Sequence, residues 1–238
     1  ALSQSNPVLG DLPKNADLIA KAAQLASAKG AKLLLTPELS LTGYPPEDLL
    51  LRDAFIQAVD QQLTQLAKNL SSYPDLRVIV GHPKRTEAGL QNMASVLYRG
   101  EIIASYAKQK LPNHEVFDEV RYFVPGDDAC VFEIDGTKIG LIICEDAWHA
   151  SAAAQAKHHG AELLVIPNAS PYHLEKQCLR EDVAKARVVE TGLPLIYLNA
   201  VGGQDELVFD GASFAFSKTG ELVLAMPQFK EDMAFIEY

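Results

Sequence analysis

Cysteines, long apolar runs and basic clusters are all scarce in this chain of 238 residues. Its three cysteines are widely spaced and form neither a metal-binding nor a disulfide framework, so we expect the reducing cytoplasm as its location. The longest apolar runs are far too short to cross a bilayer, which argues against a membrane partner. A net charge of −10 without a basic stripe argues against a nucleic-acid partner, because that binding depends on clustered Lys and Arg.

The composition that is present is that of an ordinary globular protein. Hydrophobic residues make up 48% of the chain and charged residues 22%, which is enough to bury one large core. Helical periodicity alternates with short apolar strands, hairpin signals interrupt the alternation, and no repeat or low-complexity linker divides the chain. We therefore predict one α/β domain over residues 1–238, with mixed sheets and helices on the outer faces.

Periodicity and turn residues predict the individual elements. Asn15 is expected to cap the first helix, and Asp135 with Gly136 predicts a type I′ hairpin. Residues 202–210 are expected to form a polar loop. The helices are expected over 16–29, from Pro46 to Ser71, over 147–159 and over 173–190. The strands are expected over 1–5, 32–36, 77–81, 93–98, 102–106, 131–134, 138–144, 162–167, 195–201, 213–217, 222–225 and 233–236.

One apolar strand stops abruptly at Cys144, which is followed directly by Glu145 and Asp146. The carboxyl ends of strands in open α/β sheets are where ligands collect, so this thiol is a candidate nucleophile. Burial habits alone favour the opposite interpretation, an inert core cysteine. Partner residues elsewhere in the chain have to decide between the two.

A catalytic thiol needs a base and a positive group that stabilises the oxyanion. None of the six histidines ends an apolar strand, whereas the strand predicted over 32–36 ends at Pro37 and Glu38. A carboxylate at this position can take the proton of the thiol. For the positive group, Lys108 and Lys110 lie on the same face of a predicted strand, so their spacing alone does not choose between them.

The stretch VGGQDE at 201–206 superficially looks like the pyrophosphate loop of ATP-dependent synthetases, which carries two serines. Both serines are missing here. The carboxylates of Asp205, Glu206 and Asp210 would also repel a phosphate group. Since no other stretch offers a nucleotide loop, we do not expect this chain alone to use ATP or a dinucleotide.

Several blocks, in order along the chain, resemble the nitrilase (carbon–nitrogen hydrolase) superfamily. They are a strand closed by Pro37 and Glu38, the pattern Tyr-x-Lys-x-x-Leu at 106–111, and a strand that ends in Cys144 and Glu145. Within the superfamily the chain resembles the glutamine amidase domain of glutamine-dependent NAD synthetases. The blocks that carry this closer resemblance are LTGYPPEDLL at 41–50, VFDEVRYF at 116–123, CEDAW at 144–148, NASPY at 168–172 and NAVGGQDELVFD at 199–210.

The resemblance implies a catalytic role for four residues. Cys144 would be the nucleophile, Glu38 the general base and Glu119 a supporting carboxylate that positions the lysine. Lys108 would be the lysine that stabilises the oxyanion, because the superfamily pattern places it two residues after an aromatic residue and three before a leucine.

For substrate capture, the resemblance implies His114, Glu145, Ser170 and Lys176. Glu145 would hold the α-amino group of glutamine and Lys176 its α-carboxylate. His114 stands where many members have a tyrosine; imidazole is smaller but can still donate or accept a hydrogen bond.

The resemblance also implies a nitrilase-like α-β-β-α sandwich and a homo-oligomer. The implied reaction is hydrolysis of glutamine to glutamate and ammonia through a thioester, without a cofactor. The ammonia would pass to a synthetase domain that is absent from this sequence, and ATP and deamido-NAD would be used only there. Two alternatives stay open: a stand-alone nitrilase-type hydrolase of another small amide, and a non-catalytic interaction module.

Overall fold

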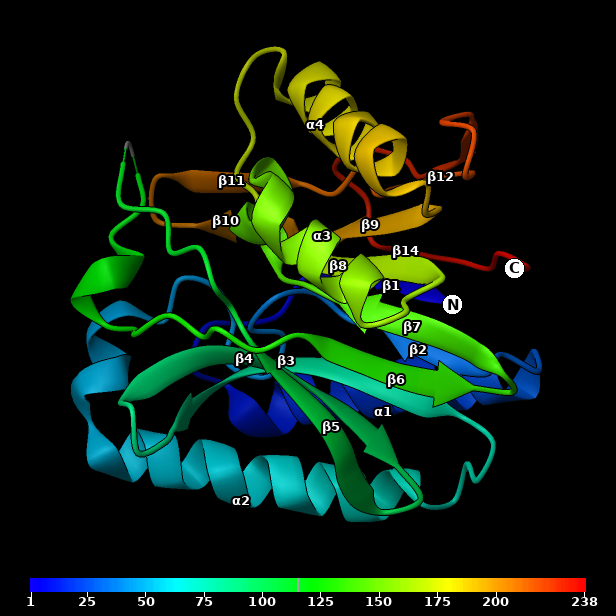
Figure 1. The fold of residues 1–238 in the computed structure, drawn as a ribbon. Coiled ribbons are helices and arrows are strands. Elements are labelled where there is room, and N and C mark those ends of the chain that lie inside the picture. Colours follow the sequence, from blue (N-terminus) through cyan, green and yellow to red (C-terminus); the bar gives the residue numbers. More distant parts are fainter. Residues whose placement is uncertain (115) are drawn as a thin grey trace.

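Two six-stranded sheets stack face to face between two layers of helices (Figure 1). The computed structural model describes residues 1–114 and 116–238. The helices α1 (Leu12–Ala28) and α2 (Asp53–Leu70) cover one sheet, and α3 (Ala150–His158) and α4 (Lys176–Thr191) cover the other. The predicted α-β-β-α sandwich is therefore confirmed.

The first sheet has the strand order β14-β1-β2-β3-β4-β5. Its central strands β1, β2 and β3 run parallel to one another, and the remaining pairs are antiparallel. It is a mixed sheet, as expected. The strands are β1 (Leu2–Gln4), β2 (Leu33–Leu35), β3 (Arg77–Arg85), β4 (Leu90–Tyr98), β5 (Glu101–Ala107) and β14 (Asp232–Ala234).

The second sheet has the order β13-β12-β9-β8-β7-β6. Its strands β7, β8 and β9 are parallel, and β6 joins β7 through the predicted type I′ hairpin, with positive φ at Asp135 and Gly136. The strands are β6 (Cys130–Ile134), β7 (Thr137–Leu141), β8 (Leu163–Asn168), β9 (Leu195–Asn199), β12 (Phe214–Phe216) and β13 (Leu222–Ala225).

Aliphatic side chains fill the space between the sheets and the space beneath the first sheet. Between the sheets, β-branched and leucine side chains from both sheets form the largest apolar cluster, which includes Ile79, Val96, Ile139 and Val165. A second cluster joins α1 and α2 to the first sheet and includes Leu63. Burial of these side chains is the main favourable term in folding and fixes how the sheets stack.

Several sequence-based expectations about elements were wrong. The first helix begins at Leu12 and is capped by Asp11, whose side chain accepts a hydrogen bond from the Lys14 N–H at 3.2 Å. The helix expected from Pro46 is interrupted: a 3-10 turn, η1 (Glu47–Leu51), precedes α2, because Arg52 adopts an extended conformation.

The third correction concerns residues 202–210. In place of a loop, the chain forms a two-stranded antiparallel ribbon, β10 (Val201–Gln204) with β11 (Leu207–Asp210). In Figure 1 this ribbon lies at the end of the molecule opposite the two termini. The glycines that looked like part of a phosphate loop lie within β10.

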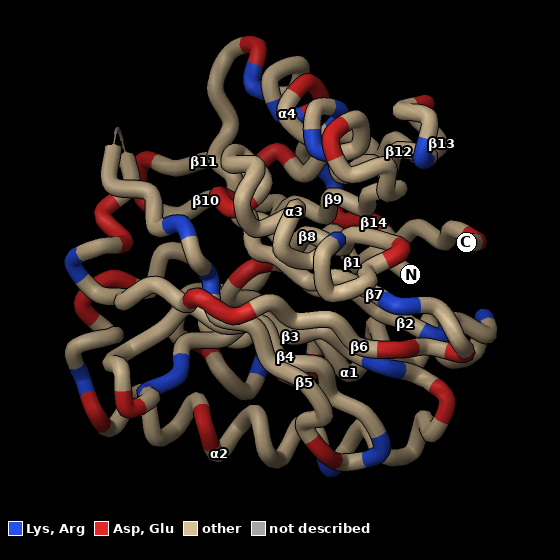
Figure 2. The backbone as a smooth tube through the Cα atoms, in the orientation of Figure 1, with Lys and Arg blue, Asp and Glu red and all other residues tan. Residues whose placement is uncertain are grey.

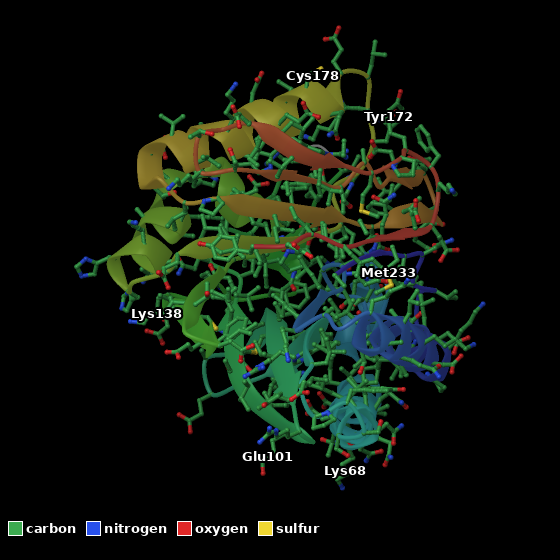
Figure 3. All side chains as sticks on the ribbon, turned by 90° about the vertical axis from the view of Figure 1, so that its right-hand side faces the viewer. Lys68, Glu101, Lys138, Tyr172, Cys178 and Met233 are labelled. Atoms are coloured by element: carbon green, nitrogen blue, oxygen red, sulfur yellow. The ribbon has the colours of Figure 1, made fainter. Side chains whose placement is uncertain are left out.

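Acidic and basic residues are interspersed along the backbone in Figure 2, and neither sign forms a continuous stripe in that view. Figure 3 shows Lys68 on the α2 side of the molecule and Cys178 on the α4 side. In the described part of the chain, no helix is both long enough and apolar enough to span a membrane.

Candidate active site

Cys144 lies where the chain leaves the second sheet. Strand β7 ends at Leu141, three residues before the predicted end, and Ile143 is still extended. Cys144 then takes a φ of +43° and opens a 3-10 turn, η3 (Cys144–Trp148). A non-glycine residue with positive φ is sterically unfavourable, and such residues cluster at functional sites because the surrounding structure has to hold them.

The Lys108 ammonium lies between two buried carboxylates. Its Nζ donates to Glu38 Oε1 at 2.7 Å and to Glu119 Oε1 and Oε2 at 2.8 and 3.0 Å. The lysine side chain is fully buried, and the two carboxylates are 1% and 5% exposed. Lys108 immediately follows β5, which ends at Ala107, so the end of the first sheet delivers the cation.

Glu38 is held by two further donors besides the lysine. The Asn92 side-chain amide on β4 donates to Oε1 at 2.8 Å, and the Ala169 N–H after β8 donates to Oε2 at 3.0 Å. Oε1 is thus oriented by groups of the first sheet, and Oε2 by a group that follows a strand of the second sheet. A base fixed in this way keeps its position while a proton moves on and off it.

Glu119 also accepts a hydrogen bond from a half-buried tyrosine. The Tyr44 hydroxyl donates to Glu119 Oε1 at 2.8 Å. Burial raises the pKa of Glu119 to about 7; the positive charge of Lys108 opposes the shift and the negative charge of Glu38 adds to it. For Lys108, burial lowers the pKa, but the charges of Glu119 and Glu38 outweigh burial and hold the pKa well above its usual value.

The Cys144 thiol lies within electrostatic range of the same cluster. Burial raises the pKa of the thiol, the charge of Glu38 raises it further, and Lys108 lowers it. The net direction is upward, so the thiol is protonated at rest. A protonated thiol needs a base before it can attack a carbonyl carbon, and Glu38 is a buried carboxylate within electrostatic range of this thiol.

Two of the predicted substrate residues line one cavity. His114 and Glu145 lie on a cavity of 700 Å³, and Lys110 is also part of its wall. The Glu145 carboxylate is 3.6 Å from His149 Nε2. The two lysines thus have different surroundings: Lys110 lines this cavity, whereas Lys108 contacts the buried carboxylates of Glu38 and Glu119.

The other two predicted substrate residues lie in different surroundings. The Ser170 hydroxyl is buried and accepts a hydrogen bond from Arg180 Nε at 3.1 Å, and the Ser170 N–H donates to Asn199 Oδ1. Lys176 begins α4, and its Nζ lies 4.5 Å from the centre of the Trp148 ring at the end of η3. Ser170 is thus engaged within the protein next to the Ala169 N–H that contacts Glu38.

The sequence prediction missed three residues around this cluster: Tyr44, Asn92 and Asp146. Asn92 is a buried polar residue on β4, one residue before the strand predicted over 93–98, and a buried amide needs a hydrogen-bond partner. Asp146 is fully buried two residues after Cys144. Among the described residues, no group of three or more His, Cys, Asp or Glu side chains is arranged to hold a metal ion.

Layer order and strand topology place the chain in the class of nitrilase-like sandwiches, and sequence comparison gives the family. The family model described as carbon-nitrogen hydrolase matches residues 1–237, so the chain belongs to the carbon–nitrogen hydrolase family. It is 41% identical over 236 residues to a glutamine-dependent NAD(+) synthetase of Rhodobacter capsulatus, which covers 99% of this chain and 42% of that protein. The chain thus spans less than half the length of this relative.

Solved structures agree with this assignment. A glutamine-dependent NAD+ synthetase from Acinetobacter baumannii, in complex with ADP, superposes with a TM-score of 0.90 at 36% identity, covering 97% of this chain and 44% of that one. A mutant amidase from Nesterenkonia sp. AN1 superposes with a TM-score of 0.84 at 28% identity, covering 97% and 89%. In that amidase, acrylamide has added to the active-site cysteine. The prediction of a carbon–nitrogen hydrolase is confirmed.

Proposed function

We propose that the chain is a glutamine amidase domain that hydrolyses the side-chain amide of glutamine to glutamate and ammonia. The observation that carries the proposal is the buried Lys108 ammonium between Glu38 and Glu119, within electrostatic range of the Cys144 thiol. These groups supply a nucleophile, a base and a stabilising cation, which acyl transfer requires. The glutamine-dependent relatives favour glutamine as the amide.

In the proposed reaction, Glu38 takes the proton of the Cys144 thiol as the sulfur attacks the amide carbon. The resulting oxyanion is stabilised by Lys108 and by the backbone N–H after Cys144. Glu38 then returns the proton to the departing amide nitrogen, which leaves as ammonia, and a thioester remains on the cysteine. Water, deprotonated by Glu38, attacks the thioester; the sulfur recovers the proton and glutamate leaves.

Glutamine would be held at its α-carbon end by the cavity next to the cluster. The Glu145 carboxylate is suited to the α-amino group, and His114 lies on the wall of the same cavity. We extend the proposal to Lys176 for the α-carboxylate and to Ser170 as part of the loop beside Glu38. Charged partners for both the α-amino group and the α-carboxylate would select an amino acid over a simple amide.

The ammonia would serve a synthetase domain, where ATP and deamido-NAD are used. The support for this part of the proposal is that the matched relatives are glutamine-dependent NAD synthetases of which this chain spans less than half. The amidase reaction itself needs only the residues named above and water.

The test is an assay of glutamine hydrolysis by the chain, in which the release of glutamate and ammonia is measured. We expect Cys144→Ala to lower turnover by about 10⁴-fold or more, because the residual rate then comes from binding and oxyanion stabilisation alone. Cys178→Ser is the matched control, since Cys178 is exposed on α4 and should leave turnover unchanged (Figure 3). Wild-type turnover in Cys144→Ala would refute the mechanism.

A second candidate function is hydrolysis of another small amide by the chain alone. The Nesterenkonia amidase favours it, because this chain covers 89% of that protein and so matches nearly all of a protein named an amidase. A panel of amides distinguishes the two functions. A clear preference for glutamine over acetamide and acrylamide supports the amidase-domain proposal, and equal or faster turnover of the simple amides supports the alternative.

A further inference from the structure

Asp146 is a buried carboxylate with no role in the proposed reaction, yet both of its oxygens are fully engaged. Oδ1 accepts hydrogen bonds from the backbone N–H groups of Gln109 at 3.0 Å and Lys110 at 2.8 Å. Oδ2 accepts from the Tyr106 hydroxyl at 2.8 Å and the Ile143 N–H at 3.0 Å. The residue is 0% exposed, so no water competes for these bonds.

The donors flank the two residues whose distance decides the reaction. Tyr106, Gln109 and Lys110 surround Lys108 at the end of β5 in the first sheet. Ile143 directly precedes Cys144 at the end of the second sheet. One side chain thus ties the segment that carries the cation to the segment that carries the thiol.

The contact pattern requires a carboxylate. An asparagine amide has one oxygen and one NH2 group, so in either orientation it places its NH2 against a backbone N–H, either at Ile143 or at Gln109 and Lys110. A buried donor that faces another donor loses its hydrogen bond, and the segments have to move apart. Burial raises the pKa of Asp146 to about 6, while the Ile143 N–H and the Tyr106 hydroxyl act in the opposite direction.

We propose that Asp146 is a positioning residue that holds the Lys108 ammonium at its working distance from the Cys144 thiol. This inference rests on the proposed function of the same site. Asp146 would act on the reaction only through the geometry of its two neighbours. Its removal should therefore lower kcat more than it changes KM, because Asp146 meets the cavity-lining Gln109 and Lys110 only at their backbone N–H groups and its own side chain does not line the cavity.

The experiment measures glutamine turnover and the alkylation of Cys144 by iodoacetamide in Asp146→Asn. Peptide mass mapping separates Cys144 from Cys130 and Cys178. We expect kcat to fall by about 10²-fold, the loss typical of a misplacement of about 1 Å, with KM changed by less than about threefold. The alkylation rate of Cys144 should fall as well, because the thiolate loses its nearby cation.

Two further variants separate positioning from general stability. Leu63→Ala opens a cavity in the apolar cluster under the first sheet, away from the site, so it should lower the melting temperature and leave kcat and alkylation unchanged. Tyr106→Phe removes one donor of the four and should lower kcat by about tenfold. If Asp146→Asn does not fold, the kcat of Tyr106→Phe tests the positioning role instead.

Wild-type kcat and alkylation in Asp146→Asn, or wild-type kcat in Tyr106→Phe, would overturn the inference. Alkylation does not require glutamine, so the two proposals can fail separately. If the wild-type chain does not hydrolyse glutamine but alkylation still slows in Asp146→Asn, the proposed function fails and the positioning role stands. If glutamine is hydrolysed and Asp146→Asn behaves as wild type, only the positioning role fails.

Discussion

At the scale of single residues, the buried cluster contains two carboxylates and one ammonium. Lys108 can neutralise only one of the charges on Glu38 and Glu119, and both carboxylates are out of water. Ionising the second carboxylate is therefore opposed by burial and by its neighbour, which accounts for the raised pKa of Glu119. Such a cluster tolerates a proton moving within it, as the proposed reaction requires.

The first prediction concerns the pH dependence of stability. The pKa of Glu119 rises from 4.5 to about 7 on folding, so between these values the folded state binds more protons than the unfolded chain. The free energy of unfolding must then fall as pH rises through this window. Glu119→Gln should flatten that fall, without abolishing it, because the pKa of Asp146 is also raised, to about 6, by burial. Denaturant unfolding across the window measures the slope, and parallel slopes in both proteins would contradict the prediction.

The second prediction separates the two lysines that sequence spacing left open. Lys108→Ala should lower kcat by about 10²-fold to 10³-fold, because it removes the oxyanion partner and leaves two buried carboxylates without a cation. Lys110→Ala keeps the backbone N–H that donates a hydrogen bond to Asp146. We therefore expect kcat within roughly threefold of the wild type. Steady-state glutamine hydrolysis compares the two. Loss of activity only in Lys110→Ala would exchange the roles.

At the scale of elements, the start of α1 shows how a side chain within a helix can anchor two loops. Asn15 was expected to cap the helix, but it lies inside α1 and is buried. Its amide donates to the Val8 carbonyl at 2.8 Å and the Leu41 carbonyl at 3.1 Å, and its Oδ1 accepts from the Val8 N–H. The helix therefore fixes the loop that follows Glu38.

The third prediction compares Asn15 with the residue that does cap the helix. Asn15→Ala removes the partners of the Val8 N–H and of the buried Leu41 carbonyl, while the Val8 carbonyl keeps the Asp11 N–H, and the change should cost about 3 kcal/mol. Asp11→Ala removes one exposed cap bond and should cost about 1 kcal/mol. Urea unfolding at constant m value gives both numbers. A larger loss in Asp11→Ala would mean that the cap, and not the loop anchor, is the stronger interaction.

At the scale of the whole molecule, a buried ion pair connects the outer helix layer with the β10–β11 ribbon and the active-site loop. Arg180 on α4 donates through Nη1 to both carboxylate oxygens of Asp210, at 2.7 and 3.0 Å, and both side chains are fully buried. The same guanidinium donates to the carbonyls of Ser170 and Pro171. The loop that presents the Ala169 N–H to Glu38 is thus held by a distant helix.

The fourth prediction breaks this pair from one side. Asp210→Asn leaves a buried guanidinium without its counter-charge, so we expect a loss of about 3–5 kcal/mol in the free energy of unfolding. Glu190→Gln is the matched control, because Glu190 pairs with Arg187 but is 45% exposed, and it should cost less than about 1 kcal/mol. Equal losses in the two variants, measured by denaturant unfolding, would contradict the assigned difference between buried and exposed pairs.

The homo-oligomer and the cytoplasmic location stay predictions. Sedimentation equilibrium of the chain checks the first: a single species of 25.9 kDa at all concentrations would contradict it.

Local chemistry in the sequence was enough to predict much of this protein. Apolar runs of strand length, the Asp135–Gly136 turn and the strand-terminal positions of Glu38 and Cys144 depend on near neighbours, and the structure has strands and turns close to these places. The ordered family blocks added the sandwich, the family and the choice of Lys108. Element ends were less accurate, as at Asn15 and in residues 202–210, because tertiary contacts there override local preference.

The contacts of the site depend on the tertiary structure. Lys108 and Lys110 have the same strand periodicity, and only the stacking of two sheets buries Lys108 against carboxylates 70 and 11 residues away in the chain. The contacts of Tyr44, Asn92 and Asp146 likewise join segments from different sheets and loops. Electrostatic energy and pKa depend on distance and burial in space, and neither quantity is set by separation along the chain.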